Sequence, residues 1–325
     1  MNLNVKGEGR LPLLSHSRQT LPALAILLGA SVWGVIWYPL RLLAALGISG
    51  TLAGTLVSLA TCLFLAVVFW RSLSAALRSI WSNSLALSRY DACLLLAALA
   101  LAGGVTNVGF VWGTIHGQVM RVMLLFYLSP AWTVFFAHWL LHERLNLADI
   151  AIALLSLAGA MLMLWSPELG LPLPADLAEW AGLLAGISFA LQNVLSRRMS
   201  HALPTLPAQL RTATVFAGGV LIGLASIAFE PISLDRLPFA PPVLTYALLL
   251  TICLGAVLAL NNMLVQYGIQ RVAANRAALI MLFEIVITAL SVWWLTGEMP
   301  GPREWSGASC IIVATLLSSW IHRRR

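Results

Sequence analysis

Glu284 has the clearest chemical potential in this sequence, because it places a carboxyl group deep inside an apolar stretch. The stretch runs from about residue 273 to 296, and Glu284 lies about 11 residues, roughly 16 Å of helix, after its start. In the middle of a bilayer a charge costs roughly 2.5–3.5 kcal/mol and usually faces a bundle interior or a water-filled cavity. We therefore expect Glu284 to exchange protons or to neutralise an ammonium group of a bound molecule. The alternative is a hydrogen-bonded Glu that holds helices together.

Two arginines and two glutamates occur in the same order in two apolar stretches. Arg121 and Arg276 begin these stretches, and Glu143 and Glu298 follow about 22 residues later, roughly 33 Å along a helix. Both signs oppose the helix macrodipole, so a partner outside the helix must stabilise each charge. We predict that Arg121 pairs with Glu298 and that Glu143 pairs with Arg276, as two gates. The alternative is that these side chains snorkel to lipid headgroups.

Amide side chains in apolar stretches are further candidates for a binding site. An unsatisfied amide is costly in an apolar medium, so each one must line a cavity or bond a neighbouring helix. Bonds between helices are the interpretation we favour for Asn107 and Asn262, and a cavity is the one we favour for Gln192, Asn193 and Gln266. These five residues are candidates for substrate binding, and Asn261 is a sixth amide of the same kind.

Aromatic residues cluster in the first apolar stretch, which also contains Gly34 and Pro39 and can therefore bend. Aromatic faces bind planar or cationic groups. Arg41, in the same stretch, is a candidate to hold a substrate carboxylate, with snorkelling to the interface as the alternative. The aromatic candidates for the binding site are Trp33, Trp37, Tyr38, Trp112 and Tyr127.

Metal and nucleotide chemistry have little support. His138 and His142 lie four residues apart beside Glu143, a spacing that can hold a metal ion on a helix face, but the histidines form no second cluster. The sequence also lacks a GxxxxGK[ST] loop for binding phosphates. We expect no metal, no other cofactor and no enzymatic activity.

The composition indicates which elements position these residues. Of the 325 residues, 60% are hydrophobic and 10% are charged, whereas soluble domains are about 45–50% apolar and about 25% charged. The chain is therefore expected to lie in a lipid bilayer without a soluble domain of usual size. The net charge of +7 comes from basic residues in short segments between apolar stretches, so we expect no nucleic-acid partner.

Windows of about 19 residues predict an all-α integral membrane protein with ten transmembrane helices. A spanning helix needs about 20 mostly apolar residues. The predicted spans are 21–45, 51–70, 92–113, 117–141, 147–165, 180–198, 208–229, 243–268, 273–296 and 304–321.

The distribution of basic residues predicts the orientation. Alternate loops and the two termini on one side contain 15 Lys and Arg residues, whereas the other side contains 3. By the positive-inside rule, both termini should be cytoplasmic. We expect a bacterial-type inner (plasma) membrane, with a cytoplasmic tail over 1–20, a basic cytoplasmic end over 322–325 and an external loop over 166–179.

The sequence contains an internal repeat. A shift of 155 residues superposes Asn107 on Asn262, Gly113 on Gly268, Arg121 on Arg276, Thr133 on Thr288, Trp139 on Trp294, Glu143 on Glu298 and Trp165 on Trp320. A shift of 156 sets Trp33 on Phe189 and Arg41 on Arg197. The repeats cover 21–165 and 180–321, and five spans in each require the second copy to cross the membrane in the opposite direction. Inverted repeats are typical of secondary transporters.

Several motifs resemble EamA-type members of the drug/metabolite transporter superfamily. The motifs are the run from Gly29 to Arg41, Leu128 to Pro130 with Leu140 to Glu143, and Phe283–Glu284 with Leu295 to Glu298. The resemblance implies a ten-helix fold with a central cavity lined mainly by spans one, three, four, six, eight and nine, and transport of small metabolites, often amino acids. Two residues depart from the pattern: Ile285 replaces a usual Pro, and His142 replaces a usual Gly.

The expected function is secondary active transport, as an exporter of small polar metabolites such as amino acids, by alternating access through a cavity at the midplane. The alternative is a proton-coupled exporter of drugs or organic cations. The expected partners are a small-molecule substrate and the bilayer. The protein is expected to be a monomer or a homodimer, because small residues such as Gly159 and Gly307 would permit close packing with another copy.

Overall fold

The computed structural model describes residues 13–48, 50–82, 87–117, 119–143, 147–164, 173–227, 240–297 and 299–321. The regular structure in these ranges is helical. The helices are α1 (Leu13–Trp33), α2 (Trp37–Ala45), α3 (Gly50–Val68), α4 (Trp70–Trp81), α5 (Arg89–His116), α6 (Val119–Phe126), α7 (Ser129–Leu141), α8 (Leu147–Leu164), α9 (Leu177–Ala202), α10 (Ala208–Ile227), α11 (Pro241–Ile269), α12 (Ala274–Met281), α13 (Phe283–Thr296) and α14 (Pro302–Ile321).

Each predicted span coincides with one helix or with two consecutive helices. Among the described residues, seven helical segments are long and apolar enough to cross a membrane: Thr20–Ala45, Gly50–Val68, Arg89–His116, Arg121–Leu141, Ala208–Ile227, Pro241–Ile269 and Ala274–Leu295. Ile150–Leu164 is apolar but shorter. The helices α9 and α14 are long enough but more polar. A multi-pass membrane protein is therefore supported, and the number of ten spans stays a prediction.

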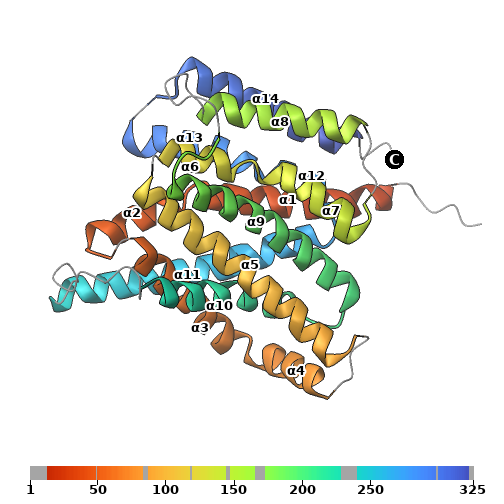
Figure 1. The fold of residues 1–325 in the computed structure, drawn as a ribbon, viewed down its shortest axis with the longest axis vertical. Coiled ribbons are helices and arrows are strands. Elements are labelled where there is room, and N and C mark those ends of the chain that lie inside the picture. Colours follow the sequence, from red (N-terminus) through yellow and green to blue (C-terminus); the bar gives the residue numbers. More distant parts are fainter. Residues whose placement is uncertain are drawn as a thin grey trace, which may run out of the picture.

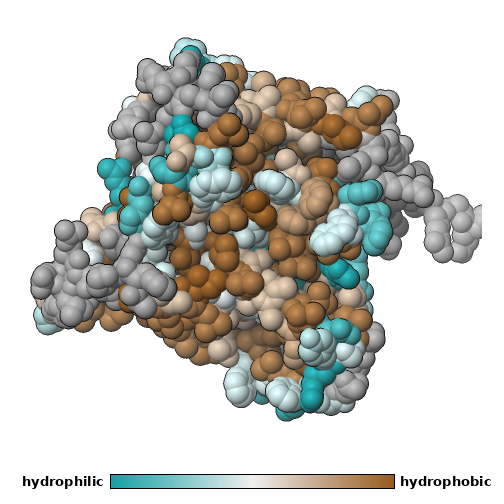
Figure 2. All heavy atoms as spheres, in the orientation of Figure 1, coloured by the Kyte–Doolittle hydropathy of each residue, from teal (hydrophilic) through white to brown (hydrophobic). Residues whose placement is uncertain are grey.

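The long helices lie side by side and run between two sides of the molecule (Figure 1). The helix α1 begins and α14 ends on the same side, at the right of Figure 1, and we call this the C-terminal side. Figure 2 shows the molecule in the same orientation. On the face toward the viewer, hydrophobic side chains lie across the middle and hydrophilic ones gather toward the left and right ends. This distribution is the one expected for a bundle that crosses an apolar layer.

Three of the predicted spans are interrupted, which separates α1 from α2, α6 from α7, and α12 from α13. Pro130 explains the second interruption, because it has no N–H to donate to the carbonyl of Phe126, four residues before it, and its ring clashes with that carbonyl. The third occurs at Leu282 although Ile285 replaces the usual proline. At both sites an i to i−3 bond tightens the chain, from the Ala131 amide to Leu128 (3.0 Å) and from the Ile285 amide to Leu282 (3.1 Å). The second repeat therefore bends without proline.

Two repeat-related residues end α7 and α13 in the left-handed conformation. They are His142, with φ of 53°, and Gly297, with φ of 78°. The Glu143 amide also donates to the Ala137 carbonyl (3.2 Å), as in a Schellman motif. Left-handed geometry costs a residue with a Cβ roughly 1–2 kcal/mol, so His142 is strained where Gly297 is not.

We expect His142→Gly to stabilise the protein by about 1 kcal/mol, because relief of this strain exceeds the extra entropy of glycine in the unfolded chain. The measurement is the thermal unfolding midpoint of the purified protein in detergent. Gly297→Ala is the converse control: a Cβ there would meet nothing within 4 Å, so a loss of stability would come from backbone strain. A His142→Gly protein that melts below wild type would contradict the expectation.

Close helix packing uses small residues within one chain. A Cβ on Gly159 would lie 2.7 Å from the Gly307 carbonyl oxygen, and one on Gly307 would lie 2.5 Å from the Gly159 carbonyl oxygen. These glycines therefore bring α8 and α14 of the same chain together. The expectation of a monomer or a homodimer stays a prediction.

Candidate functional site

The three interrupted spans meet at Glu284. This residue lies in the first turn of α13, and Tyr127 lies in the interruption between α6 and α7. The Tyr127 hydroxyl donates a hydrogen bond of 3.2 Å to Glu284 Oε1. From the third span, Gly34 approaches so closely that a Cβ on it would lie 2.8 Å from the Glu284 carbonyl oxygen. Residues from both repeats therefore meet at Glu284, Tyr127 at its carboxyl group and Gly34 at its main chain.

The surroundings of Glu284 favour a negative charge only weakly. The N-terminus of α13 offers the positive end of a helix dipole, and Tyr127, which is 5% exposed, offers one donor. Within the described residues, no Lys or Arg forms an ion pair with Glu284. The Glu284 side chain is half-buried. Because no described cation neutralises its carboxyl group, this group is suited to binding a proton or the cationic group of a ligand.

Trp37 lies next to this site, at the start of α2. Its indole N–H donates to Ser291 Oγ (2.9 Å), and the Ser291 hydroxyl lies 3.0 Å from the carbonyl oxygen of Gly34. These bonds tie the interruption of the first span to α13. The indole N–H is already used, so Trp37 can offer its ring but not this donor to a ligand.

An aromatic cluster from both repeats adjoins Tyr127. The Phe126 ring centroid lies 5.4 Å from that of Tyr127, 4.8 Å from Phe110 and 5.4 Å from Phe189. The sequence pattern indicated Tyr127 but not the three phenylalanines. The signal was present for Phe189, which matches Trp33 in the repeat, but an isolated Phe in an apolar stretch is otherwise typical of packing.

The amides occupy two kinds of environment. The three amides of α11 bond to other helices. Asn262 Oδ1 accepts a hydrogen bond from the Thr212 hydroxyl (3.1 Å), and the Gln266 side-chain oxygen accepts one from the Ser196 hydroxyl. Asn261 donates a hydrogen bond to the Gly29 carbonyl (3.2 Å). Asn107 donates to the Gly103 carbonyl of its own helix (3.1 Å). Each of these amides therefore has at least one hydrogen-bond partner within the protein, without a ligand.

Gln192 and Asn193 are less committed. Within the part of the chain that the structure describes, the Gln192 side-chain oxygen is buried without a hydrogen-bond partner, and Asn193 Nδ2 lies 3.9 Å from the sulfur of Met281. Met281 ends α12 and lies three residues before Glu284 in the chain. Asn193 therefore contacts the segment that leads into Glu284. A buried acceptor such as the Gln192 oxygen is suited to bind a ligand donor.

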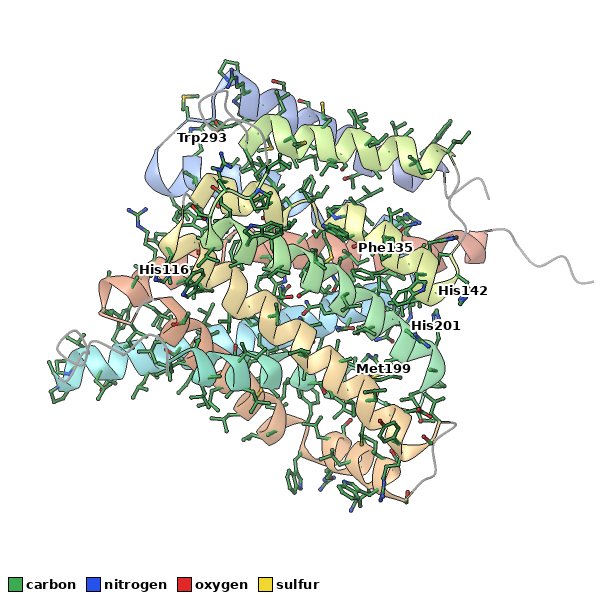
Figure 3. The ribbon with its side chains drawn as sticks, viewed as in Figure 1. His116, Phe135, His142, Met199, His201 and Trp293 are labelled. Carbon is green, nitrogen blue, oxygen red and sulfur yellow. The ribbon has the colours of Figure 1, made fainter. Side chains whose placement is uncertain are left out.

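The remaining aromatic candidates lie elsewhere. Trp33 packs against the buried cluster of Ile36, Leu43, Val57, Phe216, Leu254 and Leu258. Tyr38 contacts Trp37 edge-on, with centroids 5.7 Å apart, and is 37% exposed. Trp112 stacks on His116 at the end of α5, on the side opposite the C-terminal side (Figure 3). Arg41 is exposed.

Among the described residues, Glu143 and Arg121 form ion pairs with partners other than those predicted. Glu143 Oε1 accepts from Arg197 Nε (2.9 Å), and its other oxygen accepts from the Ala274 amide (3.1 Å) at the start of α12. Arg121 pairs with Glu179 (2.5 Å). The physical reason is that α9 lies along both α6 and α7 and so presents a charge at each end. Glu298, the predicted partner of Arg121, lies outside the described residues, and Arg276 is buried in α12.

The pair of Glu143 and Arg197 joins both repeats on the C-terminal side. Arg197 also donates to the carbonyls of Ile269 (2.8 Å) and Val272, which precede α12. His142, adjacent to Glu143, and His201, near the end of α9, are labelled on this side in Figure 3. One carboxylate therefore holds α7, α9 and the start of α12 together.

The pair of Arg121 and Glu179 joins α6 to α9 on the opposite side. The Glu179 carboxylate also accepts a hydrogen bond from the Ala175 amide (2.8 Å), and Glu179 is 3% exposed. Glu179 was not among the residues predicted from the sequence, although it ends an acidic segment without a basic residue. Arg197 was not predicted either, although the repeat matches it to Arg41. Only the packing of α9 identifies both as partners.

Glu179→Gln is expected to destabilise the protein by about 3 kcal/mol, because it removes the carboxylate from a largely buried ion pair with Arg121. Asp176→Asn is the matched control, since Asp176 Oδ1 caps α9 by accepting from the Glu179 amide (2.8 Å) and Asn caps as well as Asp. Thermal unfolding in low and high salt measures both. A loss that disappears in high salt would mean that the pair is exposed and screened.

Comparison with known proteins agrees with these features. The sequence model of the EamA-like transporter family matches residues 20–165 and 176–320. The chain belongs to this family. The predicted EamA resemblance is confirmed, and the protein is a multi-pass membrane transporter of the drug/metabolite transporter type.

Solved structures extend the likeness to the fold. One, titled "Crystal structure of protein", has 19% sequence identity and a TM-score of 0.69, and the match covers 95% of this chain and 98% of that one. No curated protein matches the chain. The similarity at this identity concerns the fold alone.

Proposed function

We propose that this EamA transporter is a secondary active exporter of small polar metabolites such as amino acids, working by alternating access. The observation that carries the proposal is the contact of Tyr127 with Glu284 where three interrupted spans from both repeats meet. Interrupted helices at the interface of inverted repeats are where secondary transporters bind substrates and coupling ions. Glu284 binds the ammonium group or the coupling proton, and Gln192 and Asn193 supply amide contacts.

The charged pairs serve as gates in this mechanism. The bonds of Glu143 to Arg197 and to the Ala274 amide hold the C-terminal side closed, and they must separate for a substrate to enter or leave there. By the distribution of basic residues this side faces the cytoplasm of a bacterial-type cell. Glu143 and Arg121 remain gate residues, with the partners Arg197 and Glu179.

A proton-coupled exporter of organic cations is the second candidate. The absence of an ion-pair partner for Glu284 among the described residues, together with the rings of Tyr127, Phe110, Phe126 and Phe189, favours it. A carboxylate beside aromatic faces binds an organic cation by charge and by cation–π attraction.

The two candidates are distinguished by transport into proteoliposomes with and without an imposed pH gradient. The panel contains zwitterionic amino acids, neutral metabolites and permanent organic cations, and protein-free vesicles are the control. Saturable flux of an amino acid supports the first candidate, and flux of a quaternary cation driven by a proton gradient supports the second. Flux no greater than in protein-free vesicles for every compound would contradict both.

A further inference from the structure

The helix α4 is not needed for the candidate site and lies at the periphery. It connects α3 to the segment before α5 and lies at the lower right of Figure 1, on the C-terminal side. Its sequence, WRSLSAALRSIW, is strongly amphipathic. A helix of this kind at the end of a membrane span is suited to lie at the surface of the bilayer.

One face of α4 packs on the protein. Ala76 and Ile80 are buried, and with Leu73 they join a cluster that includes Leu99, Met199 and Leu203. Because these three residues of α4 are spaced three or four apart, they occupy one face of the helix. This contact fixes which faces of α4 point away from the bundle.

A second face of α4 exposes large apolar side chains. Trp70, Leu77 and Trp81 are 67%, 48% and 70% exposed, and at 3.6 residues per turn they fall within about 40° of one another. Two exposed tryptophans on one stripe are unfavourable in water but typical of the bilayer interface. This face therefore points toward lipid.

A third face is basic. Arg71 and Arg78 are exposed and seven residues apart, so they lie about 20° apart around the helix and two turns apart along it. Arg89, from the start of α5, extends the charge, with its guanidinium 5.3 Å from the Trp81 ring centroid. Between residues 70 and 91 the sequence has one acidic residue, Asp91. Its carboxylate accepts a hydrogen bond from the Ser88 hydroxyl (2.7 Å).

The geometry points to α4 and Arg89 as a binding surface for anionic phospholipids. Arg71, Arg78 and Arg89 attract the anionic headgroups, and the acyl chains lie against Trp70, Leu77 and Trp81. Charge decides the occupant, because three arginines beside an apolar stripe match a lipid that is anionic at one end and apolar at the other. A zwitterionic lipid offers the same chains without the net charge.

The test uses the purified full-length protein in neutral detergent, with bound lipid counted by native mass spectrometry. Phosphatidylglycerol is compared with phosphatidylcholine of the same chain length, for wild type and for Arg71→Gln with Arg78→Gln. The expected loss of phosphatidylglycerol affinity is about 30-fold, because each basic residue near an anionic surface contributes roughly fivefold, or about 1 kcal/mol. Phosphatidylcholine binding should stay unchanged.

Two controls make the outcome specific. Arg198→Gln with Arg271→Gln removes the same charge from exposed residues on the same side and should retain phosphatidylglycerol. Arg71→Lys with Arg78→Lys keeps the charge and should retain most of the binding. Three results would overturn the proposal. Wild type would bind the two lipids equally, or the variant with Arg198→Gln and Arg271→Gln would lose as much phosphatidylglycerol binding as the variant with Arg71→Gln and Arg78→Gln. The third is competition by inorganic phosphate at the lipid concentration, which would indicate a site for free anions.

Discussion

Glu284→Gln is expected to reduce the flux driven by a pH gradient to the level of protein-free vesicles, while exchange of substrate across the membrane is retained. The amide keeps the size of the side chain but cannot bind or release a proton in the working pH range. Because Glu284 has no ion-pair partner among the described residues, no neighbouring salt bridge is broken by the change. The measurement is uptake into proteoliposomes with and without the gradient, using the substrate found in the panel.

Two variants separate the role of the carboxyl group from that of its surroundings. Tyr127→Phe removes the hydroxyl that donates to Glu284 and keeps the ring, so gradient-driven flux should persist and fall by roughly fivefold, the equivalent of about 1 kcal/mol for one hydrogen bond. Asp91→Asn makes the same acid-to-amide change at an exposed position and should transport like wild type. Unchanged gradient-driven flux in Glu284→Gln would reduce Glu284 to a residue that holds helices together.

Glu143→Gln is expected to open the C-terminal side of the bundle. The carboxylate accepts from Arg197 and from the Ala274 amide, and the side chains of Glu143 and Arg197 are 17% and 13% exposed. Breaking a buried pair of this kind costs about 3 kcal/mol, which corresponds to more than a hundredfold shift between closed and open states. A cysteine at Asn193, in a protein without its native cysteines, should therefore react at least tenfold faster with an impermeant maleimide from that side.

Charge exchange tests whether the pair itself acts as the gate. Glu143→Arg with Arg197→Glu restores an ion pair but cannot restore the bond to the Ala274 amide, so the labelling rate should lie between those of wild type and Glu143→Gln. Arg198→Gln, on the adjacent exposed residue, is the control and should label like wild type. Equal labelling of wild type and Glu143→Gln would mean that packing, not this pair, keeps the side closed.

Much of the architecture was predictable because it depends on local composition and on matches along the chain. Apolar stretches of membrane-spanning length predict helices wherever they occur, and the predicted spans coincide with helices or pairs of helices. The depth of Glu284 follows from the rise per residue. The likeness of Arg121 to Arg276 and of Glu143 to Glu298 indicated two related halves, and the EamA family that these motifs resemble is confirmed.

The sequence by itself therefore determined the class of the protein and its family, and it predicted Glu284 as the residue most suited to chemistry. The tertiary structure decided which residues meet. Apolar periodicity does not specify which neighbour a helix packs against, so the contact of α9 with α6 and α7, and with it the pairs of Arg121 with Glu179 and Glu143 with Arg197, emerged only from the packed bundle. In the same way Tyr127 reaches Glu284 across 157 residues of chain, because the energy of a long-range contact depends on how two elements pack and not on the local sequence of either.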